Sequence, residues 1–268
     1  MRPVTIAGRP IGPGYSPYVV AELSGNHNGR LDRALALLDA AKAAGADAVK
    51  LQTYTADTMT IDHHGPGFDI EGGLWHGQNL YALYQEAHTP WEWHAPLFAR
   101  ARDLGLAIFS TPFDSSAVDF LEALDAPAYK IASFELVDLP LIARVARVGR
   151  PVILSTGMAD EAEVAAALAV LRAHGDPDLI LLHCVSGYPT PAVESNLPRL
   201  RALAETFGAV VGLSDHSMGV AVPIAAVALG AALIEKHVTL ARADGGPDCA
   251  VSLEPPELAQ LCEGVRTA

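Results

Sequence analysis

Cysteine and basic residues are scarce in this 268-residue chain. The three cysteines, Cys184, Cys249 and Cys262, are odd in number and widely spaced, which excludes a disulfide framework and a CxxC zinc site and predicts a reducing compartment. Lysine and arginine number 18 against 31 aspartates and glutamates, giving a formal net charge of -13. This acidic balance argues against nucleic-acid binding and against docking to an anionic membrane, because both need clustered basic side chains.

Long apolar runs and nucleotide-binding motifs are also missing. The first residues, MRPVTIAGRPIGPG, lack the apolar core of a signal peptide, and no apolar run reaches the roughly 18 residues of a membrane span. These absences predict a cytoplasmic protein that does not enter a membrane. Neither GxGxxG nor GxxxxGK(S/T) occurs, which argues against an open, doubly wound nucleotide-binding sheet.

The apolar residues, 50% of the chain, fall into short runs that alternate with longer amphipathic stretches. Helical periodicity is present in residues 30–45, 117–125, 139–149, 161–175, 219–231 and 255–268. The short runs predict eight buried parallel strands: YVVAEL, ADAVKLQT, LAIFSTPF, AYKIAS, PVILSTG, LILLHCVS, AVVGLSDH and ALIEKHVT. Eight such units in a chain of this length predict a (β/α)8 TIM barrel, with residues 1–268 forming a single domain.

One connection, from Tyr54 to Thr89, is much longer than the others. Connections of this length usually cover an active site or are mobile. We expect the tryptophans Trp75, Trp91 and Trp93 to pack this connection and the helix after it, rather than to form a platform for a sugar. The stretch GNHNG is compatible with a tight turn and with a part of the site, and both alternatives stay open.

Polar side chains follow almost every predicted strand. In a TIM barrel the C-terminal ends of the strands meet at one mouth, where polar residues are typical of a catalytic site. The residues at these ends are Glu22, Lys50, Gln52, Ser110, Thr111, Lys130, Ser133, Ser155, Ser186, Ser214, His216 and His237.

His216 and His237 end the seventh and eighth predicted strands, which are neighbours in a barrel. Two imidazoles on neighbouring strands could share one divalent cation, with water and substrate as the other ligands. A single histidine is more often a hydrogen-bonded core residue, but the two together favour a metal site. Glu235 or Asp215 could orient one of the imidazoles or form a structural salt bridge, and the sequence does not decide between these roles.

Lys50 and Lys130 occupy strand ends that would otherwise be apolar. Burying an ammonium group is costly unless an anion accompanies it. With the hydroxyl groups of Thr111, Ser133 and Ser155 nearby, the two lysines predict a small phosphate- or carboxylate-bearing ligand at the mouth.

The motifs at the strand ends are similar to those of one enzyme family. AELSGNHNG, AGADAVKLQT, FSTPFD, PAYKIAS, ILSTGMA, GLSDHS and IEKHVTL have the order and spacing of the sialic acid synthase family, which the chain resembles over nearly its whole length. LQTYTADTMTID, LYALYQEAHTPWEWH and RADGGPDCAVSLEP most resemble its pseudaminic acid synthase branch. The resemblance implies a transferase that condenses phosphoenolpyruvate with an open-chain 2,4-diacetamido-2,4,6-trideoxy-altrose. The products would be a nine-carbon sugar acid and phosphate, released by C–O cleavage.

The resemblance also implies roles for individual residues. Phosphoenolpyruvate would be bound by Lys50, Thr111, Lys130, Ser133, Ser155, Ser186 and Ser214, and the amino sugar by Glu22, Gln52, Tyr188 and Asp248. A divalent metal, Mn²⁺ or Mg²⁺, would be held by His216 and His237, and Glu22 would be the acid/base group. Ser186 stands where the N-acetylneuraminate branch has asparagine.

Members of this family usually carry a C-terminal antifreeze-like domain whose arginine reaches the active site of a partner subunit. This chain ends at the last helix of the predicted barrel, so that domain is absent from it, and a homodimer is a further expectation from the resemblance. Two alternatives remain beside the pseudaminic acid assignment. One is an N-acetylneuraminate or legionaminate synthase, and the other is a non-catalytic sugar-phosphate binding protein.

Overall fold

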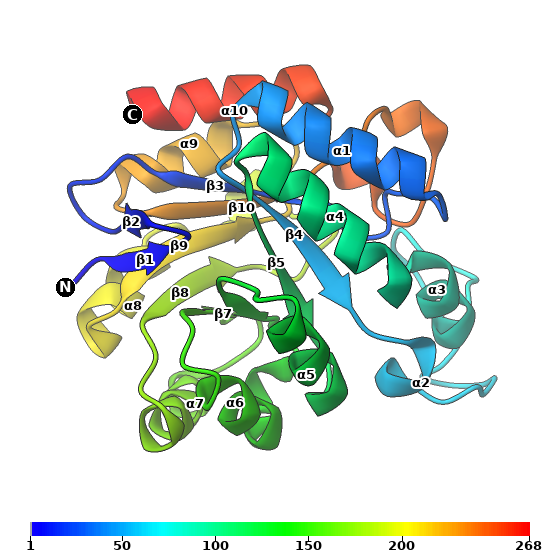
Figure 1. The fold of residues 1–268 in the computed structure, drawn as a ribbon, viewed down its shortest axis with the longest axis horizontal. Coiled ribbons are helices and arrows are strands. Elements are labelled where there is room, and N and C mark those ends of the chain that lie inside the picture. Colours follow the sequence, from blue (N-terminus) through cyan, green and yellow to red (C-terminus); the bar gives the residue numbers. More distant parts are fainter. Residues whose placement is uncertain (1) are drawn as a thin grey trace.

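The eight predicted strands form a closed parallel barrel in the computed structural model, which describes residues 2–268 (Figure 1). They are β3 (Tyr18–Glu22), β4 (Ala48–Thr53), β5 (Ala107–Pro112), β6 (Tyr129–Ile131), β7 (Val152–Ser155), β8 (Leu179–Cys184), β9 (Val210–Asp215) and β10 (Leu233–His237). Neighbours in the barrel follow chain order, and pairing of β10 with β3 closes it. The prediction of a single-domain (β/α)8 barrel is confirmed.

Helices cover the outside of the barrel between successive strands (Figure 1). They are α1 (Leu31–Ala44), α4 (Trp91–Leu104), α5 (Ser115–Ala123), α6 (Leu139–Ala146), α7 (Glu161–His174), α8 (Arg199–Phe207), α9 (Ala221–Ala228) and α10 (Pro255–Thr267). Gly45 ends α1 with a φ of 90°, a left-handed conformation that glycine adopts without a steric penalty. None of the helices within residues 2–268 combines the length and apolar character that crossing a membrane requires.

Two layers of side chains fill the barrel interior. The lower layer, near the N-terminal ends of the strands, is apolar and includes Val20, Phe109, Ile153, Leu182 and Leu233. Because successive side chains of a strand alternate between its faces, the inward position of the upper layer lies two residues further along each strand. These upper positions are Glu22, Thr111, Ser155, Cys184 and Glu235, and all of them are buried.

A short antiparallel hairpin, β1 (Val4–Ile6) and β2 (Arg9–Ile11), closes the barrel at the end opposite the mouth. Ala7 and Gly8 both have positive φ, as in a two-residue hairpin turn. The hairpin was not among the predicted elements, because its three-residue strands are too short to show periodicity. Its Ile6 and Ile11 are buried against the lower layer.

Residues 54–89, here called the lid, were predicted to be one long connection, but they contain two helices. These are α2 (Ala56–Met59) and α3 (Leu80–Ala87). The side chain of Asn79 begins α3 by accepting hydrogen bonds from the backbone N–H groups of Tyr81 and Ala82. Figure 1 places α2 and α3 at the side of the barrel remote from the hairpin, which is the side of the mouth.

Candidate active site

The polar residues predicted from the strand ends meet at the mouth of the barrel. Glu22 and Lys50 leave neighbouring strands, and their side chains form an ion pair with Nζ and Oε2 2.9 Å apart. Tyr188 and Asp248 lie on the loops after β8 and β10 and contact or approach the histidines. Residues separated by up to about two hundred positions in sequence are thus brought within reach of one small ligand, as a TIM barrel predicts.

A buried cluster of four charges forms the floor of the site. Lys50 lies between Glu22 and Glu235, with its Nζ 3.1 Å from Glu235 Oε1, and it donates a hydrogen bond to Thr111 Oγ1. Lys130 lies 3.9 Å from the same Glu235 oxygen. Two ammonium groups and two carboxylates balance one another here, which reduces the cost of burying each of them.

The charges in this cluster shift one another's proton affinity. Burial opposes protonation of Lys50, but the carboxylates of Glu22 and Glu235 outweigh it and raise the pKa of the ammonium group. Burial would raise the pKa of Glu235, but Lys130 and Lys50 outweigh it and lower the pKa, which keeps this carboxylate ionised. Burial raises the pKa of Glu22, and the nearby Lys50 offsets this only in part. Glu22 is therefore the carboxyl group of the pair that more readily takes up a proton.

Hydroxyl and amide donors gather beside Lys130. Its Nζ donates to Ser155 Oγ over 2.7 Å. The backbone N–H of Gly157 donates to Ser133 Oγ over 3.1 Å. A Cβ atom at position 157 would lie 2.8 Å from Ser133 Oγ and 2.9 Å from Ser186 Oγ, so only glycine fits here without displacing both hydroxyls. Together these groups and Lys130 suit the binding of a phosphate or carboxylate group.

The imidazoles of His216 and His237 are neighbours, with ring centroids 5.3 Å apart. His216 Nδ1 donates to the carbonyl of Val185 over 2.9 Å, which leaves Nε2 as a free acceptor. His237 Nδ1 is buried and has no hydrogen-bond partner among residues 2–268. Burial, and then the nearby His216, lower the pKa of His237 well below its usual value, so this ring is neutral.

Burial would lower the pKa of His216, but the neighbouring Cys184 outweighs it and raises the pKa. In its unprotonated form His216, together with the neutral His237, would offer two nitrogen acceptors to a divalent cation that takes its remaining ligands from substrate and water. No group of three His, Cys, Asp or Glu residues with metal-binding geometry occurs in the described part of the chain. The two imidazoles would thus be the protein ligands of such a metal, and the metal site at His216 and His237 stays a prediction.

The other face of the same two strands carries a separate ion pair. Asp215 and Lys236 lie opposite each other in β9 and β10, and the ammonium group binds the Asp215 carboxylate and the Ser217 carbonyl. The Asp215 carboxylate also accepts from Ser217 N and Ser217 Oγ, both over 3.0 Å. Lys236 is fully buried. The alternatives left open by the sequence are thereby resolved, since Asp215 and Glu235 both form ion pairs and neither hydrogen-bonds an imidazole.

The outer part of the site is formed by Tyr188, Asp248 and Gln52. The Tyr188 ring packs on His216 with centroids 4.2 Å apart. Asp248 Oδ2 accepts from Ser24 Oγ and lies 3.8 Å from His237 Nδ1. Gln52 Nε2 donates to Glu22 Oε1 over 3.0 Å. Polar groups able to bind sugar hydroxyl and amide groups therefore surround the imidazole pair on its open side.

Comparison with known proteins assigns the chain to a family. The sequence profile described as the NeuB family matches residues 37–268. The chain belongs to the NeuB family. The pseudaminic acid synthase of Helicobacter pylori is 48% identical over 93% of this chain and 74% of its own length. The pseudaminic acid synthase of Campylobacter jejuni serotype O:23/36 is 44% identical over 94% of this chain and 73% of its own length.

A solved structure of the same type agrees with this fold. The N-acetylneuraminic acid synthetase of Leptospira borgpetersenii, crystallised with citrate, superposes with a TM-score of 0.90 at 32% identity. The superposition covers 99% of this chain and 89% of that one. The superposition thus extends over nearly all of this chain.

Several residues of this NeuB-family site were missed or undervalued by the sequence analysis. Glu235 was considered as a partner for a histidine or as part of a salt bridge, but not as the group that bridges the two lysines. Gly157 was not considered, although a glycine directly after a strand end, as in STG, can indicate a close approach of the backbone to other polar groups. Trp75 was predicted to be packing only, but its ring lies 5.4 Å from that of Tyr188. Within the GNHNG stretch, the side chain of Asn26 has a structural role, because its Nδ2 donates to Val238 O and Ser252 Oγ.

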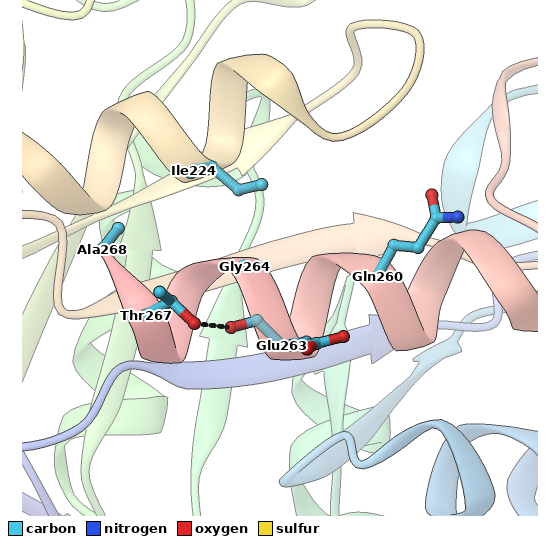
Figure 2. Close-up of a pocket in the computed structure, with 6 residues that line it drawn as sticks. All are labelled: Ile224, Gln260, Glu263, Gly264, Thr267 and Ala268. Carbon is cyan, nitrogen blue, oxygen red and sulfur yellow. Dashed lines mark hydrogen bonds between the residues drawn. The ribbon is translucent and has the colours of Figure 1, made fainter.

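A surface pocket of about 470 Å³ between α9 and α10 lies away from this chemistry (Figure 2). Figure 2 shows it lined by Ile224, Gln260, Glu263, Gly264, Thr267 and Ala268. Arg266, in the same turn of α10, binds Asp47 just before β4, which places the pocket toward the N-terminal end of the barrel. In TIM barrels the N-terminal end of the strands contributes to stability and the C-terminal end carries the catalytic residues, so this pocket is not part of the candidate active site.

Proposed function

We propose that this NeuB-family protein is a pseudaminic acid synthase. It condenses phosphoenolpyruvate with open-chain 2,4-diacetamido-2,4,6-trideoxy-altrose and releases pseudaminic acid and phosphate. The observation that carries the proposal is the union, at one mouth, of the Lys50–Lys130 charge cluster with the His216–His237 pair. The choice of sugar rests on the 48% identity to a pseudaminic acid synthase, against 32% to an N-acetylneuraminic acid synthetase.

Phosphoenolpyruvate would bind in the floor of the mouth. Its proposed ligands are Lys50, Thr111, Lys130, Ser133, Ser155, Ser186 and Ser214, together with the backbone N–H of Gly157. Because Glu22 and Glu235 already balance the two ammonium groups, the hydroxyl and N–H donors must supply much of the binding of the anion. Holding both substrates in one orientation supplies about 7–11 kcal/mol of the barrier reduction in well-oriented reactions.

The amino sugar would place its aldehyde beside His216 and His237, with Gln52, Tyr188 and Asp248 around its chain. A bound Mn²⁺ or Mg²⁺ would polarise the aldehyde as a Lewis acid. C3 of phosphoenolpyruvate attacks the aldehyde carbon, water adds at C2, and phosphate leaves with the bridging oxygen. Glu22, whose pKa burial raises, is the proposed group that takes a proton from this water at its carboxylate.

The function is tested by a product assay with the purified protein. Phosphoenolpyruvate and Mn²⁺ are combined with 2,4-diacetamido-2,4,6-trideoxy-altrose, with N-acetylmannosamine or with no sugar. The released phosphate and the mass of the product are measured. We expect phosphate and a nine-carbon acid with the first sugar only. Preference for N-acetylmannosamine would favour the N-acetylneuraminate alternative, and absence of phosphate release with every sugar would favour the binding-protein alternative.

Lys130→Ala tests the phosphoenolpyruvate site. The substitution removes a charged donor beside Ser155 and Glu235, and we expect KM for phosphoenolpyruvate to rise about tenfold or more while KM for the sugar changes little. Steady-state kinetics with each substrate varied in turn measure this. Arg144→Ala, which removes only surface ion pairs to Asp119 and Glu122, is the control. An unaltered KM for phosphoenolpyruvate in Lys130→Ala would refute the assignment.

A homodimer, with residues 1–268 as its catalytic barrel domain, is also part of the proposal. Loops on the mouth side, after β6, β7, β8 and β9, carry exposed apolar side chains that a partner subunit could cover. They are Phe134, Val137, Met158, Val193 and Met218. Val193 is 93% exposed, an unusual state for an aliphatic residue near an active site. A cytoplasmic location remains a prediction from composition.

A further inference from the structure

A ladder of aromatic rings leads from the imidazole pair out of the mouth. His237 and His216 have ring centroids 5.3 Å apart, and the Tyr188 ring follows at 4.2 Å from His216. The indole of Trp75 is the next ring, 5.4 Å from Tyr188 and tilted by 50°. His237 ends β10, His216 directly follows β9, Tyr188 lies on the loop after β8, and Trp75 belongs to the lid. Trp75 is thus the point at which the lid joins the site.

The position of Trp75 is fixed by a second contact. Its Nε1 donates to the carbonyl of Pro247 over 2.7 Å. Pro247 immediately precedes Asp248, which binds Ser24 Oγ and lies 3.8 Å from His237 Nδ1. The indole is therefore held between two components of the proposed sugar site, Tyr188 on one side and the turn before Asp248 on the other.

Trp75 is also not a core residue. Its side chain is only partly buried, and it belongs to neither of the two apolar clusters of the fold. It lines a cavity of about 170 Å³ between the lid and Pro247, with Leu74, Leu83 and Glu86 among the other walls. A partly exposed indole that is anchored by its N–H and offers its ring is typical of a ligand contact rather than of packing.

The polarity of the mouth changes along this ladder. The charged groups Lys50, Glu235 and Lys130 lie in the floor, whereas the wall beyond Tyr188 is aromatic. A sugar whose aldehyde carbon lies beside the imidazoles extends its far carbons away from the floor. The far end of the chain therefore extends toward the rings of Tyr188 and Trp75.

We propose that Trp75 is a specificity-determining residue, whose indole packs against the distal, deoxy and N-acylated end of the sugar. This inference rests on the proposed function. A methyl group at the last carbon would contact the ring, whereas a hydroxymethyl group there would lose hydration without a partner that replaces it. One such group is worth about tenfold to two-hundredfold in selectivity in an apolar subsite.

The test compares Trp75→Ala with a matched control. We expect Trp75→Ala to raise KM for the 6-deoxy diacetamido sugar at least tenfold, to leave KM for phosphoenolpyruvate within about twofold, and to narrow the preference for the 6-deoxy sugar over N-acetylmannosamine. Trp91→Phe is the control, because Trp91 binds Tyr54 O and packs on Phe120 in the helical layer. It should leave all three quantities unchanged.

Trp75→Phe separates ring packing from lid anchoring, because it keeps an aromatic ring and loses the hydrogen bond to Pro247. Recovery of sugar KM and of selectivity in Trp75→Phe supports the proposal. An unchanged KM for the sugar in Trp75→Ala would overturn the proposal. An equal rise of the KM values for the sugar and for phosphoenolpyruvate would also overturn it, because that result indicates only a displaced lid. The KM comparisons require that the wild-type protein condenses an amino sugar. If the proposed function is wrong, the wild type itself shows no condensation, and this result is distinct from a failure of the Trp75 proposal.

Fluorescence gives a second measurement that does not need an active or fully stable Trp75→Ala variant. A Trp91→Phe/Trp93→Phe protein keeps Trp75 as its only tryptophan, because the sequence has three. Titration with the 6-deoxy sugar should shift its emission with saturation, while phosphoenolpyruvate alone should not. A protein that turns over the sugar without any change in this emission would contradict the inference.

Discussion

The lower and upper halves of the barrel interior are built from the same strands but differ in their chemistry. Below, Phe109, Ile153 and Leu182 pack into an apolar core that the hairpin closes. Two residues further along those strands, Thr111, Ser155 and Cys184 belong to the buried upper layer, which also holds four charged side chains. Inward positions recur at every second residue of a strand, so the apolar layer that stabilises the barrel and the polar layer of the site are only two residues apart along each strand.

This difference predicts which substitutions affect activity and which affect folding. A change in the upper layer should reduce catalysis and, where it leaves a buried charge alone, also stability. A change in the lower layer should reduce stability while the folded molecules keep their activity.

Lys50→Met should have the largest effect. It removes the ammonium group between Glu22 and Glu235, and we expect kcat/KM to fall about 10³-fold. The free energy of unfolding should fall by about 3–5 kcal/mol, because two buried carboxylates lose their common partner. Steady-state kinetics and urea unfolding measure the two effects. Adding Glu235→Leu should recover part of the stability and none of the activity. Recovery of activity in the double variant would contradict the role given to Lys50 in the charge cluster.

Phe109→Ala should destabilise the lower layer without affecting the chemistry of the upper layer. Phe109 is fully buried in the lower layer, and its truncation leaves a cavity, so the free energy of unfolding should fall by about 3–5 kcal/mol. At a temperature where the variant is folded, kcat/KM should stay within about threefold of the wild type. A large loss of kcat/KM in the folded variant would show that the two layers are not independent.

Acidification should lower the stability of the protein through His94, a buried residue outside the charge cluster of the site. His94 of α4 binds Thr53 Oγ1 over 2.8 Å, and burial lowers its pKa to about 4 from a usual 6.5. The unfolded chain therefore takes up this proton first, and stability falls as the pH falls from about 6.5 to about 4. At about pH 5 this amounts to about 2 kcal/mol.

Urea unfolding of the wild type and of His94→Gln at about pH 7 and about pH 5 measures this contribution. We expect the loss of stability on acidification to be smaller in His94→Gln by about 2 kcal/mol. Equal losses in both proteins would mean that His94 is not the group responsible. His27, whose pKa burial also lowers to about 4, contributes to the acid sensitivity of both proteins.

The sequence alone was sufficient to predict the barrel and many of the polar side chains that gather at its mouth. Eight apolar runs gave the strands, because burial on both faces leaves a continuous hydrophobic signature. Because the ends of parallel strands meet at one mouth of a barrel, Lys50, His216 and His237 were predicted to lie near one another. The motifs from AELSGNHNG to IEKHVTL predicted the family, and the match to residues 37–268 confirmed it.

Only the tertiary structure decided which side chains are partners. Asp215 meets Lys236 because β9 and β10 pair in that register, and Glu235 meets Lys50 and Lys130 because the barrel closes. Trp75 reaches Tyr188 across more than a hundred residues of chain, through a lid with no periodic pattern. Local sequence determines which face of a strand a residue occupies, whereas contacts between distant segments depend on how the closed barrel and its loops fill space.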